Sequence, residues 1–265
     1  MYFVGHSFHM FVVKPLIYLA REAGVVGHWA EGWDMIGGST PSQHWARAGD
    51  DNEPRKALRT GRVEVLTLAT NVIMPDPAVD SFADLAVECN PAVRVVVQHS
   101  WGDHSTGLIM RARHSGGAID MSTVPTNESR DEVSAVELDA YRQGTLRQRE
   151  VLREQLGAID ARHGRSLTSL VPVGEAVIRL REFVVSGGLP GVTRQSELFR
   201  DALGHATQPT MDLVSYLWLA ALYGVNPVGL SHLVDADDPT SADRQKVLQE
   251  MAWQCLLDEP LSGIS

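Results

Sequence analysis

The chain has 265 residues, of which 44% are hydrophobic and 21% are charged, and its net charge is −10 at pH 7. These values are typical of a soluble globular protein, and the length suits one substantial α/β domain. The acidic balance and the lack of any clustered run of Lys and Arg argue against a nucleic-acid partner, because phosphate binding needs such clusters.

The first half of the chain alternates between strand-like and helix-like segments. Strands are predicted at residues 1–4, 32–36, 63–71 and 93–97, and helices at residues 10–23, 41–46 and 79–88. Continuously apolar strands that alternate with helices indicate a parallel sheet covered on both faces. The sequence therefore predicts a three-layer α/β/α sandwich.

The second half is mainly helical. Residues 109–127 are polar without a strong period and are predicted as a long loop or small insertion over the site. Residues 128–162 are highly charged and lack proline, which predicts a long exposed helix bridged by its own Glu/Arg pairs. A strand at 167–173 and helices at 175–185 and 209–223 follow. We expect a single domain over residues 1–265 with an added loop and helix at about 105–163. The long helix in this addition makes a homo-oligomer possible.

The cysteines and the hydropathy pattern bear on the compartment. Cys89 and Cys255 show neither a disulfide framework nor a metal-site spacing, and each lies among apolar helical residues where a buried free thiol is common. No signal peptide and no apolar run near the ~20 residues needed to span a bilayer are present. We expect a cytoplasmic protein without a membrane partner, although the early first strand leaves open a leader trimmed from the chain.

A serine lies in the turn between the first strand and the first helix. Gly5-His6-Ser7-Phe8 follows the strand directly, so the Ser7 hydroxyl can project from the carboxyl edge of the sheet. Its backbone N–H then lies near a helix N-terminus, where negative charge is favoured. Ser7 is a candidate nucleophile; the alternative is that it only caps the helix.

A serine nucleophile needs a base, and a candidate base lies in the last third of the chain. His205 precedes the apolar helix at 209–223, and Asp201 lies four residues earlier, with a glycine between them. A tight turn there would place the carboxylate against the imidazole and fix its tautomer. The alternative is that His205 packs on the last helices while Asp201 is a solvated loop acid.

Other polar residues also follow predicted strands. Asn71 could direct its amide at an oxyanion and Gly38 could offer a backbone N–H, although a turn-forming Asn and a glycine required by the backbone are the simpler interpretations. His99 follows the fourth predicted strand. The carboxyl ends of parallel strands are where ligands bind in such sheets.

These motifs together resemble the SGNH (GDSL-like) hydrolase superfamily. The likeness rests on Gly5-His6-Ser7-Phe8, Gly37-Gly38-Ser39-Thr40, Ala69-Thr70-Asn71 and Asp201 to His205. It implies a flavodoxin-like parallel sheet and no cofactor, with Ser7 as nucleophile, His205 as base and Asp201 as its orienting acid. It also implies an oxyanion hole formed by the Ser7 N–H, Gly38 or Gly37, and Asn71.

The chain departs from the pattern of this superfamily at three positions. His6 and Val72 replace its usual aspartates, and the spacing from Asp201 to His205 is one residue longer than the usual Asp-x-x-His. The longer spacing leaves open a Ser–His dyad without the carboxylate.

The remaining histidines have two interpretations. His6, His9, His99 and His104 could gather at the sheet edge and bind zinc, but no pair has the spacing of a recognised metal motif. We expect instead that His6, His99 and Trp101 contact the substrate, and that no metal is bound.

The resemblance implies an esterase, since members of the superfamily include many enzymes that remove acetyl groups from carbohydrates. We therefore expect hydrolysis of an ester on a carbohydrate or other small polar molecule. The alternatives are a metal- or histidine-assisted lyase or hydrolase on the same scaffold, and a catalytically silent binding or assembly protein.

Overall fold

The structure, a computed structural model, describes residues 1–264, without the side chains of Asp50 and His104. Five parallel strands form one sheet in the order β2-β1-β3-β4-β5. The strands are β1 (Tyr2–Gly5), β2 (Gly32–Met35), β3 (Val65–Ala69), β4 (Arg94–Gln98) and β5 (Thr168–Val171). The predicted parallel sheet is confirmed.

The strand order places a crevice beside β1. The chain crosses from β1 outward to β2 and then returns past β1 to β3, so Val4 pairs with Asp34 on one side and with Leu68 on the other. At such a reversal the connections leave the sheet in opposite directions, and ligands bind outside the carboxyl ends of the two strands. Ser7 and Asn71 follow these two ends.

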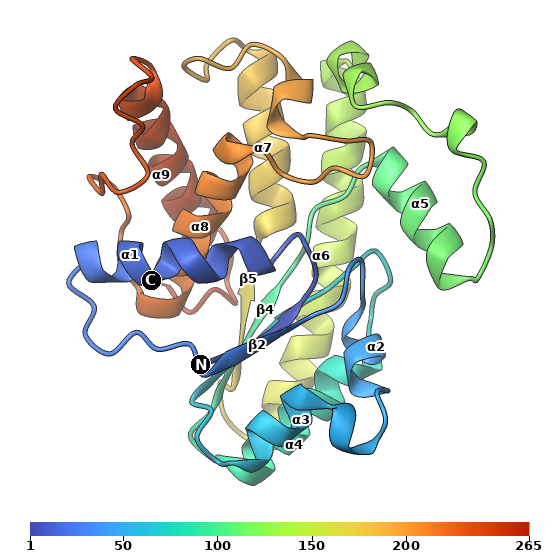
Figure 1. Ribbon diagram of the computed structural model, residues 1–265, viewed down its shortest axis with the longest axis vertical. Helices are drawn as coiled ribbons and strands as arrows, with labels where there is room; N and C mark the ends of the chain where they lie inside the picture. Colours follow the sequence, from blue (N-terminus) through green and yellow to red (C-terminus); the bar gives the residue numbers. More distant parts are fainter. Residues whose placement is uncertain (265) are drawn as a thin grey trace.

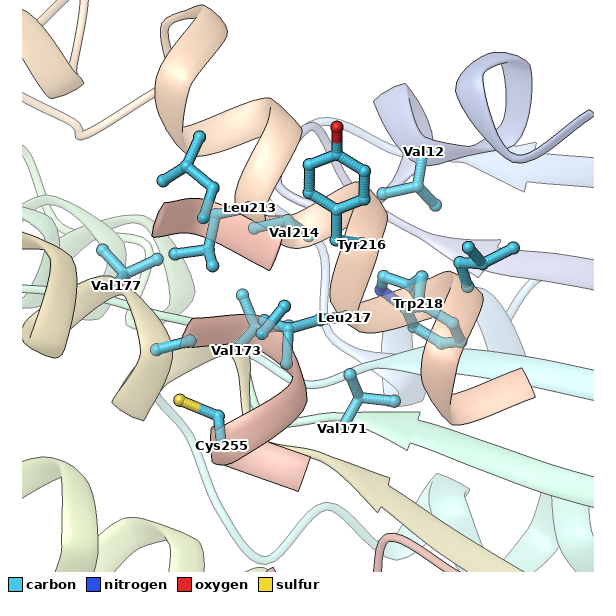
Figure 2. Packing of buried hydrophobic residues seen from close by; sticks show 14 of the residues in the cluster. Val12, Val171, Val173, Val177, Leu213, Val214, Tyr216, Leu217, Trp218 and Cys255 are labelled. Atoms are coloured by element: carbon cyan, nitrogen blue, oxygen red, sulfur yellow. The ribbon is translucent and has the colours of Figure 1, made fainter. Parts of the chain in front are cut away.

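Four helices cover one face of the sheet (Figure 1). They are α1 (Val13–Glu22), α7 (Val173–Val185), α8 (Gln208–Tyr223) and α9 (Ser241–Leu257). Residues 212–222 of α8 are all buried, because this helix is apolar on nearly every side and lies between its neighbours. Figure 2 shows Leu217 and Trp218 of α8 in the core that this helix forms with Val171 and Val173.

The other face is covered by α2 (Pro41–Trp45), α3 (Glu53–Arg59), α4 (Pro77–Cys89) and α6 (Ala135–His163). Side chains alternate between the faces along a strand. Phe3 therefore joins the core under α8, while Tyr2 and Val4 join the opposite core with Phe82 of α4. Both faces of the sheet are thus buried, as continuously apolar strands predict.

The segment predicted as a loop at 109–127 begins inside a helix. α5 (His104–His114) starts at Asp103, whose carboxylate caps the N–H of Thr106, and a 3₁₀ turn follows at Met121–Thr123. The prediction was wrong for residues 109–114, because α5 buries only a narrow stripe and therefore shows little apolar period.

The charged segment after α5 also differs from its prediction. A 3₁₀ turn occupies Glu128–Glu132 and α6 begins at Ala135, where Ser134 and Glu137 form a capping box. The arginines of α6 pair mainly with other elements, for example Arg153 with Glu259 at 2.9 Å. The long helix is present from Ala135 onward, and Arg153 also pairs with Glu150 of the same helix at 3.1 Å. The prediction was wrong for the first residues, and for the exposure, because buried leucines and charges hold the helix against the rest of the protein.

Cys89 and Cys255 are free thiols. Among residues 1–264, no helix combines the length and the apolar character that crossing a bilayer requires.

Candidate active site

Ser7 and His205 meet at the crevice beside β1, although 198 positions separate them in the chain. The Ser7 Oγ lies 3.0 Å from Nε2 of His205, and Nδ1 of the same ring lies 2.6 Å from Oδ2 of Asp201. Because the Nδ1–H donates to the carboxylate, Nε2 is free to accept the proton of the serine hydroxyl. The three residues form a hydrogen-bonded series of Ser, His and Asp in the arrangement that the sequence predicts for a nucleophile, a base and an orienting acid.

The turn between Asp201 and His205 accommodates the longer spacing. The other carboxylate oxygen of Asp201 accepts hydrogen bonds from the N–H groups of Gly204 (3.0 Å) and His205 (3.1 Å). Gly204 has φ +90°, which an L-residue rarely adopts, so the glycine permits the turn. Burial disfavours the ionised form of Asp201, but the hydrogen bonds from His205 and Gly204 outweigh it and lower its pKa.

Side chains from three other segments fix this turn through its carbonyl groups. Arg130 donates to the carbonyls of residues 201 and 202, Thr106 to that of residue 203, and the Trp101 Nε1–H to that of Gly204. Arg130 is itself held by Asp103, with Nε 2.7 Å from Oδ2. Four consecutive carbonyls are therefore fixed from outside the turn, which orients the His205 ring. Sequence reasoning missed Arg130 and Thr106, because neither lies in a motif.

The Gly37–Gly38 turn lies beside the nucleophile. Gly38 lines a small cavity together with Ser7, whereas Gly37 does not. Within residues 1–264, the backbone N–H groups of Ser7 and Gly38 donate no hydrogen bond. Both are therefore free to bind a negatively charged oxygen in the cavity.

Asn71 also lines this cavity, but its amide is engaged. Its Nδ2 donates to the carbonyl oxygens of Gly38 at 3.0 Å and Ser39 at 2.9 Å, and its Oδ1 accepts from the Val72 N–H. In this conformation Asn71 holds the Gly38 turn in place. Its role as a direct oxyanion donor stays a prediction.

A second series of Ser, His and Asp lies under the same turn. Nε2 of His44 lies 2.7 Å from the Ser39 Oγ and Nδ1 lies 2.5 Å from Oδ2 of Asp34, whose other oxygen contacts Arg47 at 2.6 Å. We call Ser39, His44 and Asp34 the buried array. Ser39 and His44 are almost completely buried, so the array reaches no substrate and instead anchors the residue after Gly38.

His6 supports the serine turn with both ring nitrogens. Its Nε2–H donates to the Thr70 carbonyl at 2.9 Å, and its Nδ1 accepts from the Phe8 N–H at 3.2 Å. Burial lowers its pKa to about 4, against a smaller opposing effect of the Thr70 carbonyl, so the ring is neutral. His6 lines the cavity as predicted, but its polar atoms are bonded to the backbone.

The structure separates the other predicted contact residues. Trp101 lines the cavity and stacks on Phe8, with ring centroids 4.3 Å apart. His99 is fully buried, does not line the cavity, and lies against Gly174. Because His99 does not border the cavity, its predicted contact with substrate is not supported by the structure.

The histidines do not form a metal site in the part of the chain that the structure describes. No group of three or more His, Cys, Asp or Glu side chains there could hold a metal ion. His9 stacks on Trp218 inside the core, and the side chain of His104 lies outside the described residues.

Comparisons of the chain with protein families, with curated proteins and with solved structures found no match.

Proposed function

We propose that this protein is a serine hydrolase of the SGNH type that removes an O-acyl group from a carbohydrate or other small polar molecule. The observation that carries the proposal is the contact of the Ser7 hydroxyl with a His205 ring that Asp201 orients, at the mouth of a cavity. The sequence likeness to SGNH hydrolases supports the same roles for these three residues.

The proposed reaction has two halves. The Ser7 oxygen attacks the acyl carbon while Nε2 of His205 takes the hydroxyl proton, and Asp201 stabilises the resulting imidazolium. The tetrahedral intermediate then expels the alcohol, which receives that proton from His205. In the second half a water molecule, deprotonated by His205, attacks the acyl-serine; the carboxylic acid is released and Ser7 regains its proton.

The oxyanion of each tetrahedral intermediate needs donors that are already in place. The N–H groups of Ser7 and Gly38 supply them, and Asn71 keeps the Gly38 turn in position through its two carbonyl contacts. Donors fixed before the reaction stabilise the developing charge without reorganisation, which is worth about 3 kcal/mol for a single donor.

The cavity supports a small acyl group. Its wall includes the apolar side chains of Phe8, Trp101, Met110 and Leu203. Such a wall fits an acetyl or similarly short acyl chain beside the nucleophile.

Hydrolysis of 4-nitrophenyl acetate tests the proposal. Ser7→Ala should lower kcat by about a thousandfold or more, and Asp201→Asn should lower it strongly because the ring loses its preferred tautomer. Ser81→Ala, at a half-buried position on α4 that does not line the cavity, is the matched control and should retain full activity. Labelling of the wild type, but not of Ser7→Ala, by a fluorophosphonate gives a second readout. Unchanged turnover in a folded Ser7→Ala protein would refute the proposal.

A further inference from the structure

Helix α5 divides the space at the carboxyl edge of the sheet into two compartments. Thr106 and Met110, one turn apart, line the catalytic cavity described above. Gly107 and Arg111, on the adjacent stripe of the helix, line a second, open cavity. The two cavities share Asn71, Ser100 and Trp101, so the second one adjoins the catalytic cavity; we call it the polar compartment.

The polar compartment contains donors that no protein group uses. Across residues 1–264, neither the Arg111 guanidinium nor the Gln148 amide of α6 makes a hydrogen bond or an ion pair. The carboxylate that lines this compartment, Asp103, is engaged by Arg130 at 2.7 Å and caps Thr106. The compartment therefore presents an uncompensated positive charge.

The surroundings of Arg111 leave room for a ligand. A methyl group built at Gly107 would meet no atom within 4 Å, so the helix surface next to Arg111 is open. Arg113 lies on the other side of α5, and its Nη1 is 3.3 Å from the position that a Cβ on Gly38 would occupy. A second guanidinium therefore lies near the Gly37–Gly38 turn. In a chain of net charge −10, these two cations create a local field opposite to that of the whole protein.

We infer that the substrate of the proposed hydrolase is an O-acylated molecule that also carries an anionic group. The acyl chain occupies the catalytic cavity, and the alcohol portion extends past Asn71 and Trp101 into the polar compartment. There Arg111 binds the carboxylate, phosphate or sulfate, and Gln148 donates to a neighbouring oxygen. A guanidinium fits all three anions because it offers paired N–H donors. This inference rests on the proposed esterase function.

A matched pair of esters tests the inference. We would compare 4-acetoxybenzoate with 4-acetoxybenzamide, which have nearly the same shape and differ in charge. The wild type should show the higher kcat/KM for the benzoate, and this preference should shrink at high salt because exposed charges are screened. Arg111→Gln should lower kcat/KM for the benzoate by about tenfold and leave the benzamide unchanged. 4-Acetoxyphenyl phosphate and sulfate then show which anion is preferred.

Two further variants keep the result interpretable. Arg147→Gln removes the same charge from an exposed position of α6 outside the compartment and should leave both esters unaffected. Arg111→Lys retains the charge and should recover part of the preference, and thermal melting shows whether each variant folds. Equal loss for both esters in Arg111→Gln, or a wild type that prefers the benzamide, would overturn the inference. Failure of the proposed function looks different, because the wild type would then hydrolyse neither ester faster than Ser7→Ala.

Discussion

His44 Nε2 lies 2.7 Å from the hydroxyl oxygen of Ser39, the residue that directly follows Gly38. Burial lowers the pKa of His44 although Asp34 opposes this, so the ring is neutral. Its Nε2 therefore accepts a hydrogen bond from the Ser39 hydroxyl. The buried array thus has the same tautomer as the series of Ser7, His205 and Asp201, and it holds the residue that follows Gly38, the proposed oxyanion donor.

Replacing Ser39 by Ala should therefore affect catalysis more than binding. Loss of one buried hydrogen bond should lower the free energy of unfolding by about 1 kcal/mol. The Gly38 N–H would be held less rigidly, and kcat should fall by about tenfold with little change in KM. Urea unfolding and steady-state kinetics measure the two effects. A loss of stability with full kcat would show that the array serves only the fold.

Gly38 offers a second test of the oxyanion turn. Its φ is +67°, and a methyl group there would lie 2.9 Å from Cε of Met110. Gly38→Ala should cost about 1–2 kcal/mol of stability through backbone strain and should lower kcat by at least about tenfold, because the turn must shift.

Gly24 is the matched control for this variant. It has φ +73° at the end of α1, and nothing lies within 4 Å of its would-be Cβ. Gly24→Ala should show a similar loss of stability in thermal unfolding but wild-type turnover. Equal turnover in the two variants would remove Gly38 from the proposed oxyanion hole.

The buried histidines make the stability of the fold depend on pH. Burial lowers the pKa of His6 to about 4 and those of His9 and His99 to about 3, against an ordinary value of 6.5. Between these values each of the three rings is protonated in the unfolded chain and neutral in the folded one, so stability rises with pH. His44, whose pKa burial also lowers, adds to this effect. Burial raises the pKa of Asp212 to about 6, which subtracts one proton below that pH.

Three histidines less one aspartate give a net uptake of at least two protons on unfolding, before His44 is counted. The free energy of unfolding should therefore fall by at least about 3 kcal/mol per pH unit from pH ~6 to ~4.5. Urea unfolding at several pH values measures the slope. His99→Leu should reduce the slope by about 1.4 kcal/mol per pH unit, because one proton fewer is taken up on unfolding. The nitrogens of this ring have no hydrogen-bond partner in the described residues, so the substitution breaks no hydrogen bond. The same slope in that variant would contradict a neutral His99 in the fold.

Local sequence signals predicted the parts of the site that lie on strand ends and turns. Ser7 and Gly38 follow strands, and the strand-then-turn pattern is visible within ten residues of sequence. The pairing of Asp201 with His205 also follows from a short segment with a glycine in it. That His205 would reach Ser7 required the order of the strands, which depends on packing between distant segments.

The missed features depend on contacts between distant segments. The stripe of α5 that faces the cavities is too narrow to give an apolar period, and Gly107 weakens the helical signal further. The buried array combines Asp34 from β2 with His44 from α2, and nothing in either segment indicates that Ser39 joins them. The charged residues of α6 predict ion pairs within one helix. Arg153, however, contacts Glu259 near the end of the chain, and the local sequence does not indicate this partner.

The Asp201–Gly204 turn has a consequence for changing this protein. The carbonyl groups of this turn accept hydrogen bonds from Trp101, Thr106 and Arg130. Trp101 and Thr106 also form part of the wall of the cavity. A substitution that widens the wall at either position also loosens the imidazole. In the proposed hydrolase, acyl-group preference and turnover would therefore change together at these two positions. Redesign for larger acyl groups should begin at Met110, which borders the cavity and makes no hydrogen bond to this turn.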